Sequence, residues 1–364
     1  IKAVRMRSSL FNDASAMFSK ESIRFVELSS ESYGHTMGEY SKVSKLPFVP
    51  DEKAERVARC NDIFQIQVEG LKRRVKTTGG KLVVGISGGL DSTLALLVSA
   101  ECMRQLGRPS DDVIGITMPC FGTSDRTFNN SLELMKTLGV ESKTISIKNA
   151  CLQHFDDIGH DPNVLDVTYE NSQARERTQI LMDYAGMVGG FVVGTGDLSE
   201  LALGWCTYNG DHMSMYAVNC DVPKTLIRWV IDSLVESGKF ASSADVLRDI
   251  LDTPISPELL PPDAKGKISQ VTEDIVGPYA LHDFFLFYTV RYGFEPEKIY
   301  HLAKRAFKND FSNEVIKKWL KTFYKRFFTQ QFKRNCVPDG VKVGSVALSP
   351  RGDWKMPSDA SANL

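Results

Sequence analysis

Residues 82–92 read LVVGISGGLDS, and the apolar stretch TLALLVSA follows at once over 93–100. A continuous apolar run such as Leu82 to Ile86 is typical of a strand buried on both faces of a parallel sheet, and the second stretch is typical of a helix. Gly88 and Gly89 lie between them and let a ligand approach the backbone closely. Because the free N–H groups and the dipole of a helix N-terminus favour anions, the sequence predicts a phosphate-binding turn.

The turn differs from a Walker A loop, because no GK[ST] follows and it carries no lysine to reach a terminal phosphate. Its polar side chains are the hydroxyls of Ser87 and Ser92, which add hydrogen-bond donors, and the carboxylate of Asp91. An ordinary glycine-rich turn is the alternative. The strand before the turn and the helix after it favour phosphate binding.

The composition is that of an ordinary globular protein. The 364 residues are 42% hydrophobic, which is enough for the core of two domains or of one large domain. With 44 basic and 45 acidic side chains the formal charge is −1, which argues against a general nucleic-acid or membrane-surface partner. Seven cysteines without a CxxC pair favour a reducing cytoplasm over a disulfide framework or a zinc ribbon. No apolar stretch approaches the roughly 20 residues of a membrane span, so we expect no membrane-embedded segment.

The character of the chain changes near residue 50. Residues 1–50 show no sustained periodicity and end in KLPFVP, whose two prolines discourage regular structure. We interpret them as a linker or a domain remnant, and because the sequence starts with Ile1 we expect a fragment. From Asp51, apolar residues recur at helical spacing and predict a helix that ends at Gly79 and Gly80.

Strand and helix patterns then alternate, which predicts an α/β fold with a doubly wound parallel sheet. The expected elements are strands over 81–86, 113–118, 141–147 and 190–194, and helices over 92–106, 124–138, 172–187, 279–292 and 312–332. Ligands of such sheets bind beyond the carboxyl ends of the strands, where Ser87 and Thr195 fall. The stretch 254–278 is rich in Pro, Gly and charge and is interpreted as a lid or as a plain surface loop.

A second polar cluster is YENSQARERTQ, residues 169–179. Asn171 can orient a polar ligand, and Arg175 or Arg177 can bind carboxylate or phosphate oxygens. The alternative is a solvated helical turn with local ion pairs.

A third cluster is VVGTGDLSELALGWCTYNGD, residues 192–211, in which an apolar strand again leads into a glycine-rich turn. A carboxylate of this turn could share Mg²⁺ with Asp91, because two oxygen ligands and substrate phosphates suit this ion. The alternative for Asp197 and Ser199 is that they only cap the following helix.

Two lysines near apolar or aromatic residues are further candidates. Lys224 in DVPKTLIRW (221–229) precedes an apolar helix and could be a counter-charge for phosphate, although a lone lysine usually faces solvent. Lys333 and its neighbour Arg334 lie among aromatics before a Pro/Gly break, where basic residues can also be merely solubilising. Metalloprotease chemistry finds no support, since the sequence contains no HExxH.

The string SGGLDS resembles the SGGxDS loop of the ATP pyrophosphatase superfamily. Together with YENSQAR, GTGDLSE, WCTYNGD, DVPKT and QQFKRNCVPDG, it resembles the synthetase domain of glutamine-dependent NAD⁺ synthetases, from about residue 45 to the C-terminus. The sequence RGDW at residues 351–354, near the C-terminus, resembles that of the bacterial long form of these synthetases. The resemblance implies an adenine nucleotide α-hydrolase-like fold. It also implies that MgATP adenylates the nicotinate carboxylate of deamido-NAD⁺, with release of pyrophosphate, and that ammonia then displaces AMP.

The resemblance also assigns residues. Those implied to bind ATP are Gly85, Ile86, Ser87, Gly88, Gly89, Leu90, Asp91, Ser92, Thr195 and Lys224. Those implied to bind deamido-NAD⁺ are Asn171, Arg175, Glu200, Trp205, Cys206, Thr207, Tyr208 and Lys333. Asp91 and Glu200 would hold Mg²⁺, and the implied catalytic residues are Asp91, Lys224 and Asp211, the last to position or deprotonate ammonia.

The family carries an N-terminal nitrilase-like amidase domain that makes ammonia from glutamine with a Glu-Lys-Cys triad. No cysteine here matches that triad, so we expect residues 1–50 to be the remnant of that domain and its linker, and residues 51–364 to be the synthetase domain. The chain should then use free ammonia and form at least a dimer. The rival interpretations are another pyrophosphate-loop enzyme, such as a GMP synthetase or a tRNA thiolase, and a module that binds ATP without turnover.

Overall fold

The computed structural model describes residues 43–253, 259–260 and 272–361. Its centre is a five-stranded sheet in the order β3-β2-β1-β4-β5, and every strand pairing in it is parallel. The strands are β1 (Lys81–Gly85), β2 (Val113–Thr117), β3 (Glu141–Thr144), β4 (Gly190–Gly194) and β5 (Tyr216–Ala217). The predicted doubly wound parallel sheet is therefore confirmed. Its strand order reverses between β1 and β4, and such a reversal opens the crevice in which ligands of these sheets bind.

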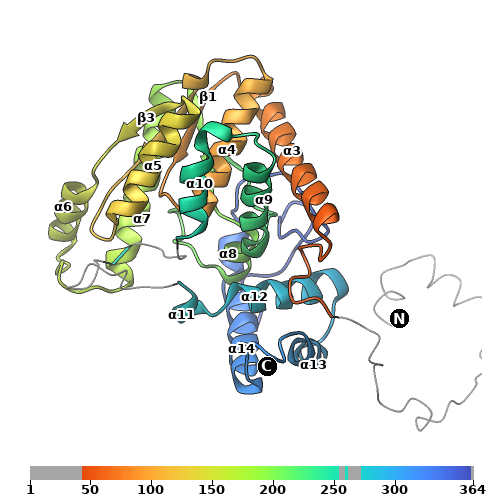
Figure 1. Ribbon diagram of the computed structural model, residues 1–364. Coiled ribbons are helices and arrows are strands. Elements are labelled where there is room, and N and C mark those ends of the chain that lie inside the picture. The colour runs from red at the N-terminus through yellow and green to blue at the C-terminus, as the bar shows by residue number, and fades with distance from the viewer. Residues whose placement is uncertain (1–42, 254–258, 261–271, 362–364) are drawn as a thin grey trace, which may run out of the picture. The chain divides into compact units, whose positions relative to one another are not determined.

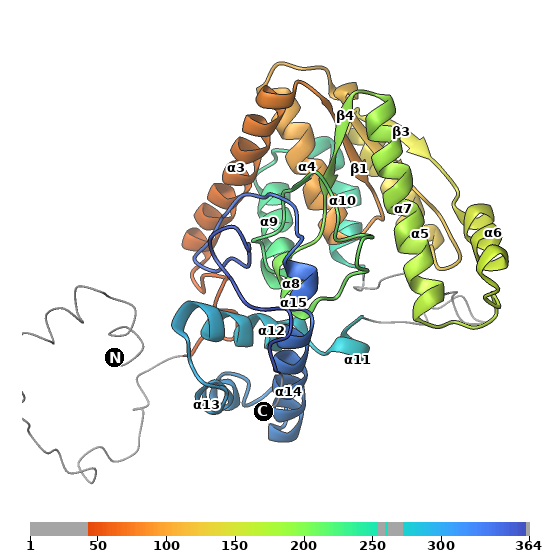
Figure 2. The same ribbon diagram turned by 180° about the vertical axis from the view of Figure 1, so that it is seen from behind.

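Helices cover both faces of the sheet. One face carries α3 (Lys53–Thr78), α4 (Leu90–Gln105), α5 (Asp125–Leu138), α9 (Lys224–Glu236) and α10 (Ala244–Leu251), and the other carries α6 (Lys148–Ile158) and α7 (Val167–Met187). Figure 1 shows the first of these faces and Figure 2 shows α7 across the second. Leu82 and Val84 of β1 join the core of the first face, while Val83 joins the core of the second. The apolar strand β1 is thus buried on both faces of the sheet.

The long helix α3 confirms the helix predicted from Asp51 to Gly79. Its N-cap is Glu52, whose carboxylate accepts the backbone N–H groups of Ala54 and Glu55. It ends at Gly79, which adopts the left-handed conformation with φ 72°. Its apolar face packs against α4 and α9 and so covers the helix that begins at the phosphate-binding turn.

A second layer consists of helices from the C-terminal part of the chain, together with one short helix that follows β4. Its elements are α8 (Leu198–Leu203), α11 (Thr272–Val276), α12 (Tyr279–Leu286), the π-helical segment η5 (Phe287–Arg291), α13 (Pro296–Ala306), α14 (Asn313–Thr329) and α15 (Gln331–Arg334). Buried Asp283 of α12 accepts the hydroxyl of Ser199 in α8, and it accepts the N–H and hydroxyl of Thr225 in α9 at 3.0 and 2.6 Å. One carboxylate thereby joins the helical layer to the sheet layer.

The last part of the chain returns to the sheet. Gly340 forms a parallel bridge with Ala217 of the edge strand β5, and the N–H of Ala217 donates to the carbonyl of Asp339 at 2.8 Å. The Asp339 carboxylate also pairs with Arg74 at 2.8 Å and with Arg351 at 2.7 Å. This segment therefore occupies the edge of the sheet beyond β5.

The structure corrects three predicted boundaries. Helix α4 begins at Leu90 and not at 92, so Asp91 lies in its first turn. Helix α7 begins at Val167 and not at 172, because Asp166 caps it by accepting two backbone N–H groups. Strand β3 ends at Thr144 and not at 147, because it is an edge strand with alternating exposure and α6 starts soon after it.

Several elements have no counterpart among the predicted ones. They are short: α6 and α13 have 11 residues each, α10 has 8 and β5 has 2. The helix predicted over 279–292 is α12 followed by the π-helical segment, and the helix predicted over 312–332 is α14 followed by α15. Such short elements depend on tertiary packing more than on a sustained periodic pattern.

Most of the stretch 254–278, interpreted from sequence as a lid or a surface loop, lies outside the described residues. At its end, α11 leads into α12 of the helical layer. Within the ranges that the structure describes, no helix combines the length and the apolar character needed to cross a membrane.

The helical layer contains a buried imidazole that makes its stability depend on pH. Burial lowers the pKa of His282 to about 4, and its Nε2 lies 2.6 Å from the carbonyl of Val276. The unfolded chain takes up this proton as the pH falls through about 6.5, whereas the folded chain resists until about 4. At ~1.4 kcal/mol per pKa unit, we expect about 3 kcal/mol of stability to be lost across that window.

The measurement is urea unfolding of the natural chain and of His282→Gln at a series of pH values from 7 to 4. Glutamine keeps a donor for Val276 but does not titrate, so its free energy of unfolding should fall less steeply. Equal slopes for the two proteins would contradict the buried neutral imidazole.

Candidate active site

The predicted phosphate-binding turn joins β1 to α4 beside the reversal of the strand order. Gly89 is the N-cap of α4, and no side chain of the described residues caps this end of the helix. The Ser87 and Ser92 hydroxyls lie 3.1 Å apart, and Ser92 Oγ accepts the Ser87 N–H at 3.3 Å. The serines thus shape the turn, and the first N–H groups of α4 are left to bind an anion.

Gly88 is required by both conformation and space. Its φ is +82°, and a Cβ at this position would clash with the carbonyl oxygen of Thr127 in α5. Gly89 is less restricted, because a Cβ there would meet only Ser87 Oγ, at 3.5 Å. The two glycines of the motif therefore have different roles.

A buried ion cluster lies at the start of α4. The Nζ of Lys224 is 2.6 Å from Asp91 Oδ2, 2.7 Å from Asp197 Oδ2 and 2.9 Å from Glu200 Oε1. Lys224 is the first residue of α9 and is only 3% exposed, so it is not the solvent-facing lysine of the alternative interpretation. Asp197 caps α8, as the alternative interpretation of this residue predicted, and it also binds Lys224.

The cluster has more negative than positive charge. Burial alone would lower the pKa of the Lys224 ammonium, but Asp197, Asp91 and Glu200 raise it well above its usual value. Burial raises the pKa of Glu200 to about 7, and the charge of Asp91 adds to this effect while Lys224 opposes it. Three carboxylates around one ammonium, with one acid fully buried and two partly exposed, therefore favour a further cation.

Asn219 is an essential part of the site that the sequence analysis did not select. Its buried Nδ2 donates to the carbonyl of Asp91 at 2.9 Å and to that of Thr195 at 3.0 Å. Gln67 of α3, also fully buried, donates to Asn219 Oδ1 at 3.0 Å and to the carbonyl of Val218 at 2.8 Å. These amides fix the end of β4 to the start of α4. No local sequence motif predicts the roles of Asn219 and Gln67, because their partners are distant in the sequence.

The segment 204–208 follows α8 and is held by predicted site residues. Lys333 Nζ donates to the carbonyls of Gly204 at 2.9 Å and Cys206 at 2.6 Å. The Thr207 hydroxyl donates to Asn171 Oδ1 at 2.8 Å. Asn171 and Lys333 therefore both contact the segment 204–208, which contains other residues predicted to bind the same ligand.

Aromatic and basic side chains extend from this segment to the surface. Tyr208 is 45% exposed, stacks on His212 with ring centroids 5.4 Å apart, and lies near Phe332. Arg175 is exposed and donates to the carbonyl of Tyr208 at 3.3 Å. Trp205 is packed against the core of the helical layer, whereas Tyr208 is exposed.

Two other basic residues of the clusters have structural contacts. Arg177 donates to the carbonyl of Met118 at 3.4 Å. Arg334 is buried and donates to the carbonyls of Leu201 and Ala202 at 3.0 and 2.9 Å. Arg334 is therefore not a solubilising residue but part of the packing beneath α8.

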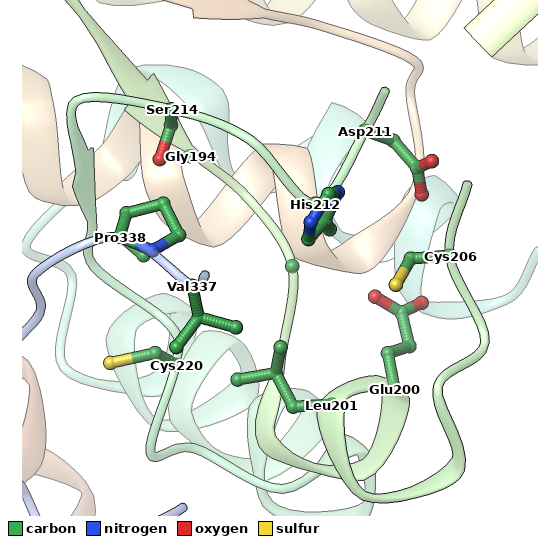
Figure 3. A pocket seen from close by; sticks show the side chains of 12 residues that line it. Gly194, Glu200, Leu201, Cys206, Asp211, His212, Ser214, Cys220, Val337 and Pro338 are labelled. Carbon is green, nitrogen blue, oxygen red and sulfur yellow. The ribbon is translucent and has the colours of Figure 1, made fainter. Parts of the chain in front are cut away.

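A pocket connects the ion cluster to the segment 204–208. Glu200, Cys206 and Asp211 share its lining, together with His212, Ser214 and residues of the C-terminal segment. In Figure 3 the carboxylates of Glu200 and Asp211 point toward each other past the thiol of Cys206. Asp211 Oδ1 accepts the N–H of Thr207 at 2.7 Å, and this hydrogen bond ties Asp211 to the segment 204–208.

This arrangement agrees with the comparisons with known proteins. The family model described as NAD synthase matches residues 63–329. Of the site residues described above, Phe332, Lys333, Arg334 and the C-terminal residues that line the pocket lie outside this range.

The chain belongs to the NAD synthase family. It is 41% identical over its whole length to the glutamine-dependent NAD(+) synthetase of Mycobacterium leprae, and it spans 57% of that protein. It is 30% identical to the protein of the same name from Thermotoga maritima, over 82% of this chain and 48% of that one. The chain thus spans about half the length of these curated relatives.

Solved structures share the fold. The crystal structure of a glutamine-dependent NAD(+) synthetase from Cytophaga hutchinsonii superposes with a TM-score of 0.68 at 17% identity, covering 84% of this chain and 55% of that one. An NMN synthetase from Francisella tularensis superposes with a TM-score of 0.53 at 24% identity, covering 70% of this chain and 97% of that one. The adenine nucleotide α-hydrolase-like fold implied by the sequence is thereby confirmed.

The contrast between the two glycines of the turn gives a matched pair of variants. In Gly88→Ala, the positive φ and the clash with Thr127 should cost about 2 kcal/mol or more. Gly89→Ala should cost less than about 1 kcal/mol. Urea unfolding and equilibrium binding of ATP check both, and we expect weakened ATP binding only in Gly88→Ala. Equal stability of the two variants would contradict the geometry of the turn.

Asn219→Ala would leave the carbonyls of Asp91 and Thr195 without their buried donor. Because each unsatisfied buried group costs ~1–3 kcal/mol, we expect a loss of about 3 kcal/mol in the free energy of unfolding. Asn163→Ala, at an exposed asparagine, is the control and should stay within about 0.5 kcal/mol of the natural chain. If chemical denaturation gave the same midpoint for both variants, Asn219 would not be the link assigned to it.

Proposed function

We propose that the chain catalyses the ATP-dependent amidation of deamido-NAD⁺ to NAD⁺, with release of AMP and pyrophosphate through an adenylated intermediate. The observation that carries the proposal is the uncapped start of α4 next to the Asp91, Asp197, Glu200 and Lys224 cluster, in a chain that the NAD synthase model matches. Adenylation needs positive partners for a departing pyrophosphate. The N–H groups of the turn and the Lys224 ammonium supply them.

The implied Mg²⁺ fits the residues of the cluster. Carboxylate oxygens of Asp91, Asp197 and Glu200 lie within 4.8 Å of one another. Asp91 Oδ1 is buried and has no hydrogen-bond partner among the described residues. Asp91 and Glu200 would hold the ion, which when bound would neutralise charge on the ATP phosphates.

The second substrate has its own proposed surface. The exposed ring of Tyr208 would stack with an aromatic ring, and the nearby Arg175 guanidinium offers donors for phosphate or carboxylate oxygens. Asn171, Glu200, Lys333 and the segment 204–208 would border the same substrate. Asp211 lies in the pocket beside Glu200 and would position or deprotonate ammonia.

We also propose a division of the whole protein. Residues 51–364 would be the synthetase domain, which is supported by the compact unit Val43–Leu364. Residues 1–50 would belong to the linker and amidase domain of the longer relatives, whose names describe them as glutamine-dependent. Ammonia would come from that amidase in the whole protein, and the synthetase domain would form at least a dimer.

The test is NAD⁺ formation by the purified chain from deamido-NAD⁺ and MgATP, with ammonium in one reaction and glutamine in another. We expect product with ammonium alone and one AMP and one pyrophosphate for each NAD⁺. Product with glutamine would overturn the proposed division of the chain. A folded chain that binds ATP but releases no pyrophosphate would favour a non-catalytic binding module.

A second arm uses Tyr208→Ala. Loss of the stacking face should raise the KM for deamido-NAD⁺ at least tenfold and leave the KM for ATP within about threefold, since stacking is worth ~1–3 kcal/mol per base. Met215→Ala is the control, because Met215 is 42% exposed on the neighbouring chain segment but is outside the proposed surface. Unchanged KM values in Tyr208→Ala would remove Tyr208 from the substrate site.

A further inference from the structure

The three acids around Lys224 differ in their access to solvent. The side chains of Asp91 and Glu200 are 23% and 22% exposed, whereas the side chain of Asp197 is fully buried. A ligand that arrives from solvent therefore meets the side chains of Asp91 and Glu200 first. It cannot reach Asp197 in the same way.

The position of Asp197 is also fixed by the backbone. Its Oδ1 accepts the N–H of Glu200 at 2.7 Å, and the Glu200 carboxylate returns to the N–H of Asp197 at 3.4 Å. This reciprocal capping box begins α8, whose first N–H donates to the carbonyl of Val222 at 3.1 Å. Only the second oxygen of Asp197 is left to bind Lys224, at 2.7 Å.

Lys224 itself fills the space between the acids. Its ammonium contacts one oxygen from each acid, and its other neighbour is the ring of Tyr279, whose centroid is 5.4 Å away. A second cation cannot contact the same three oxygens while the ammonium remains central. Asp91 and Glu200 must therefore turn away from Lys224 if they are to bind a second cation.

We propose that Asp197 is a positioning residue that keeps the Lys224 ammonium inside the cluster while Asp91 and Glu200 exchange that ammonium for the magnesium ion, a role that rests on the proposed function. Asp197 is then the permanent partner of the lysine and not a metal ligand. The lysine stays next to the phosphate-binding turn after the exchange, because its buried anchor does not move. Without a cation from solution, the same ammonium neutralises the two exposed acids.

The first experiment measures Mn²⁺ binding to the free protein by electron paramagnetic resonance, without any nucleotide. Mn²⁺ is the probe because it accepts the same oxygen ligands as Mg²⁺. Lys224→Met should bind Mn²⁺ at least tenfold more tightly than the natural chain, since the competing ammonium is gone. The double variant Asp197→Asn with Lys224→Met should match Lys224→Met within about twofold, because Asp197 acts only through the lysine.

Two results would overturn the proposal. If Lys224→Met bound Mn²⁺ no more tightly than the natural chain, the lysine would not compete for the cation position. If the double variant bound it at least tenfold more weakly than Lys224→Met, Asp197 would be a metal ligand. Should Lys224→Met fail to fold by circular dichroism, Lys224→Gln and its double variant give the same comparison with an amide donor retained.

Glu101→Gln is the matched control. The Glu101 side chain is 2% exposed and paired with Arg104 and Lys239, but it lies at the far end of α4. Its loss should leave Mn²⁺ binding unchanged. Mn²⁺ binding needs no turnover, so the proposed function and the proposed role of Asp197 can fail separately. NAD⁺ formation by the natural chain tests the function. Comparison of Mn²⁺ binding by the natural chain, Lys224→Met and the double variant tests the role of Asp197.

Discussion

One buried ammonium group determines how the parts of this protein meet. Lys224 lies at the N-terminus of α9, where the helix dipole disfavours a positive charge. It is stable there because acids from α4 and α8 surround it, and those acids are in turn stable only with the lysine between them. The three helix starts must therefore converge on one point. This convergence places the phosphate-binding turn, the capping box of α8 and the helical layer next to each other.

Several polar groups near the cluster bind side chains from outside it. Asn219 donates to the carbonyls of Asp91 in α4 and Thr195 after β4, and Gln67 holds Asn219 in place. Asp283 pairs with α8 and α9. Lys333 does the same for the segment after α8. Irregular backbone at the carboxyl edge of a parallel sheet has few partners of its own, so these side chains replace the hydrogen bonds that a strand or helix would provide.

The sequence predicts the parts of this structure that depend on neighbouring residues. The apolar run before Gly88, the helix after it and the turn after β4 follow from local patterns, and so does the parallel sheet. Lys224 could be selected as a candidate, but its burial among three acids could not be foreseen because the partners are up to 133 residues away. Asn219, Gln67 and Asp283 are missed for the same reason. The ligand assignments came from resemblance to a family, since no spacing rule relates the segment 204–208 to Lys333.

The bridge between Ala217 and Gly340 has a consequence for the synthesis of this protein. The strand at the edge of the sheet is completed by a segment that is synthesised long after β5, together with Lys333 and the carboxylate that joins Arg74 to Arg351. While translation is in progress, β5 has an open edge, and open edges promote pairing with other chains. This edge of the sheet therefore cannot be completed until Gly340 has been synthesised. A stop between β5 and Gly340 would release a chain that contains the predicted phosphate-binding turn but leaves the edge of β5 unpaired.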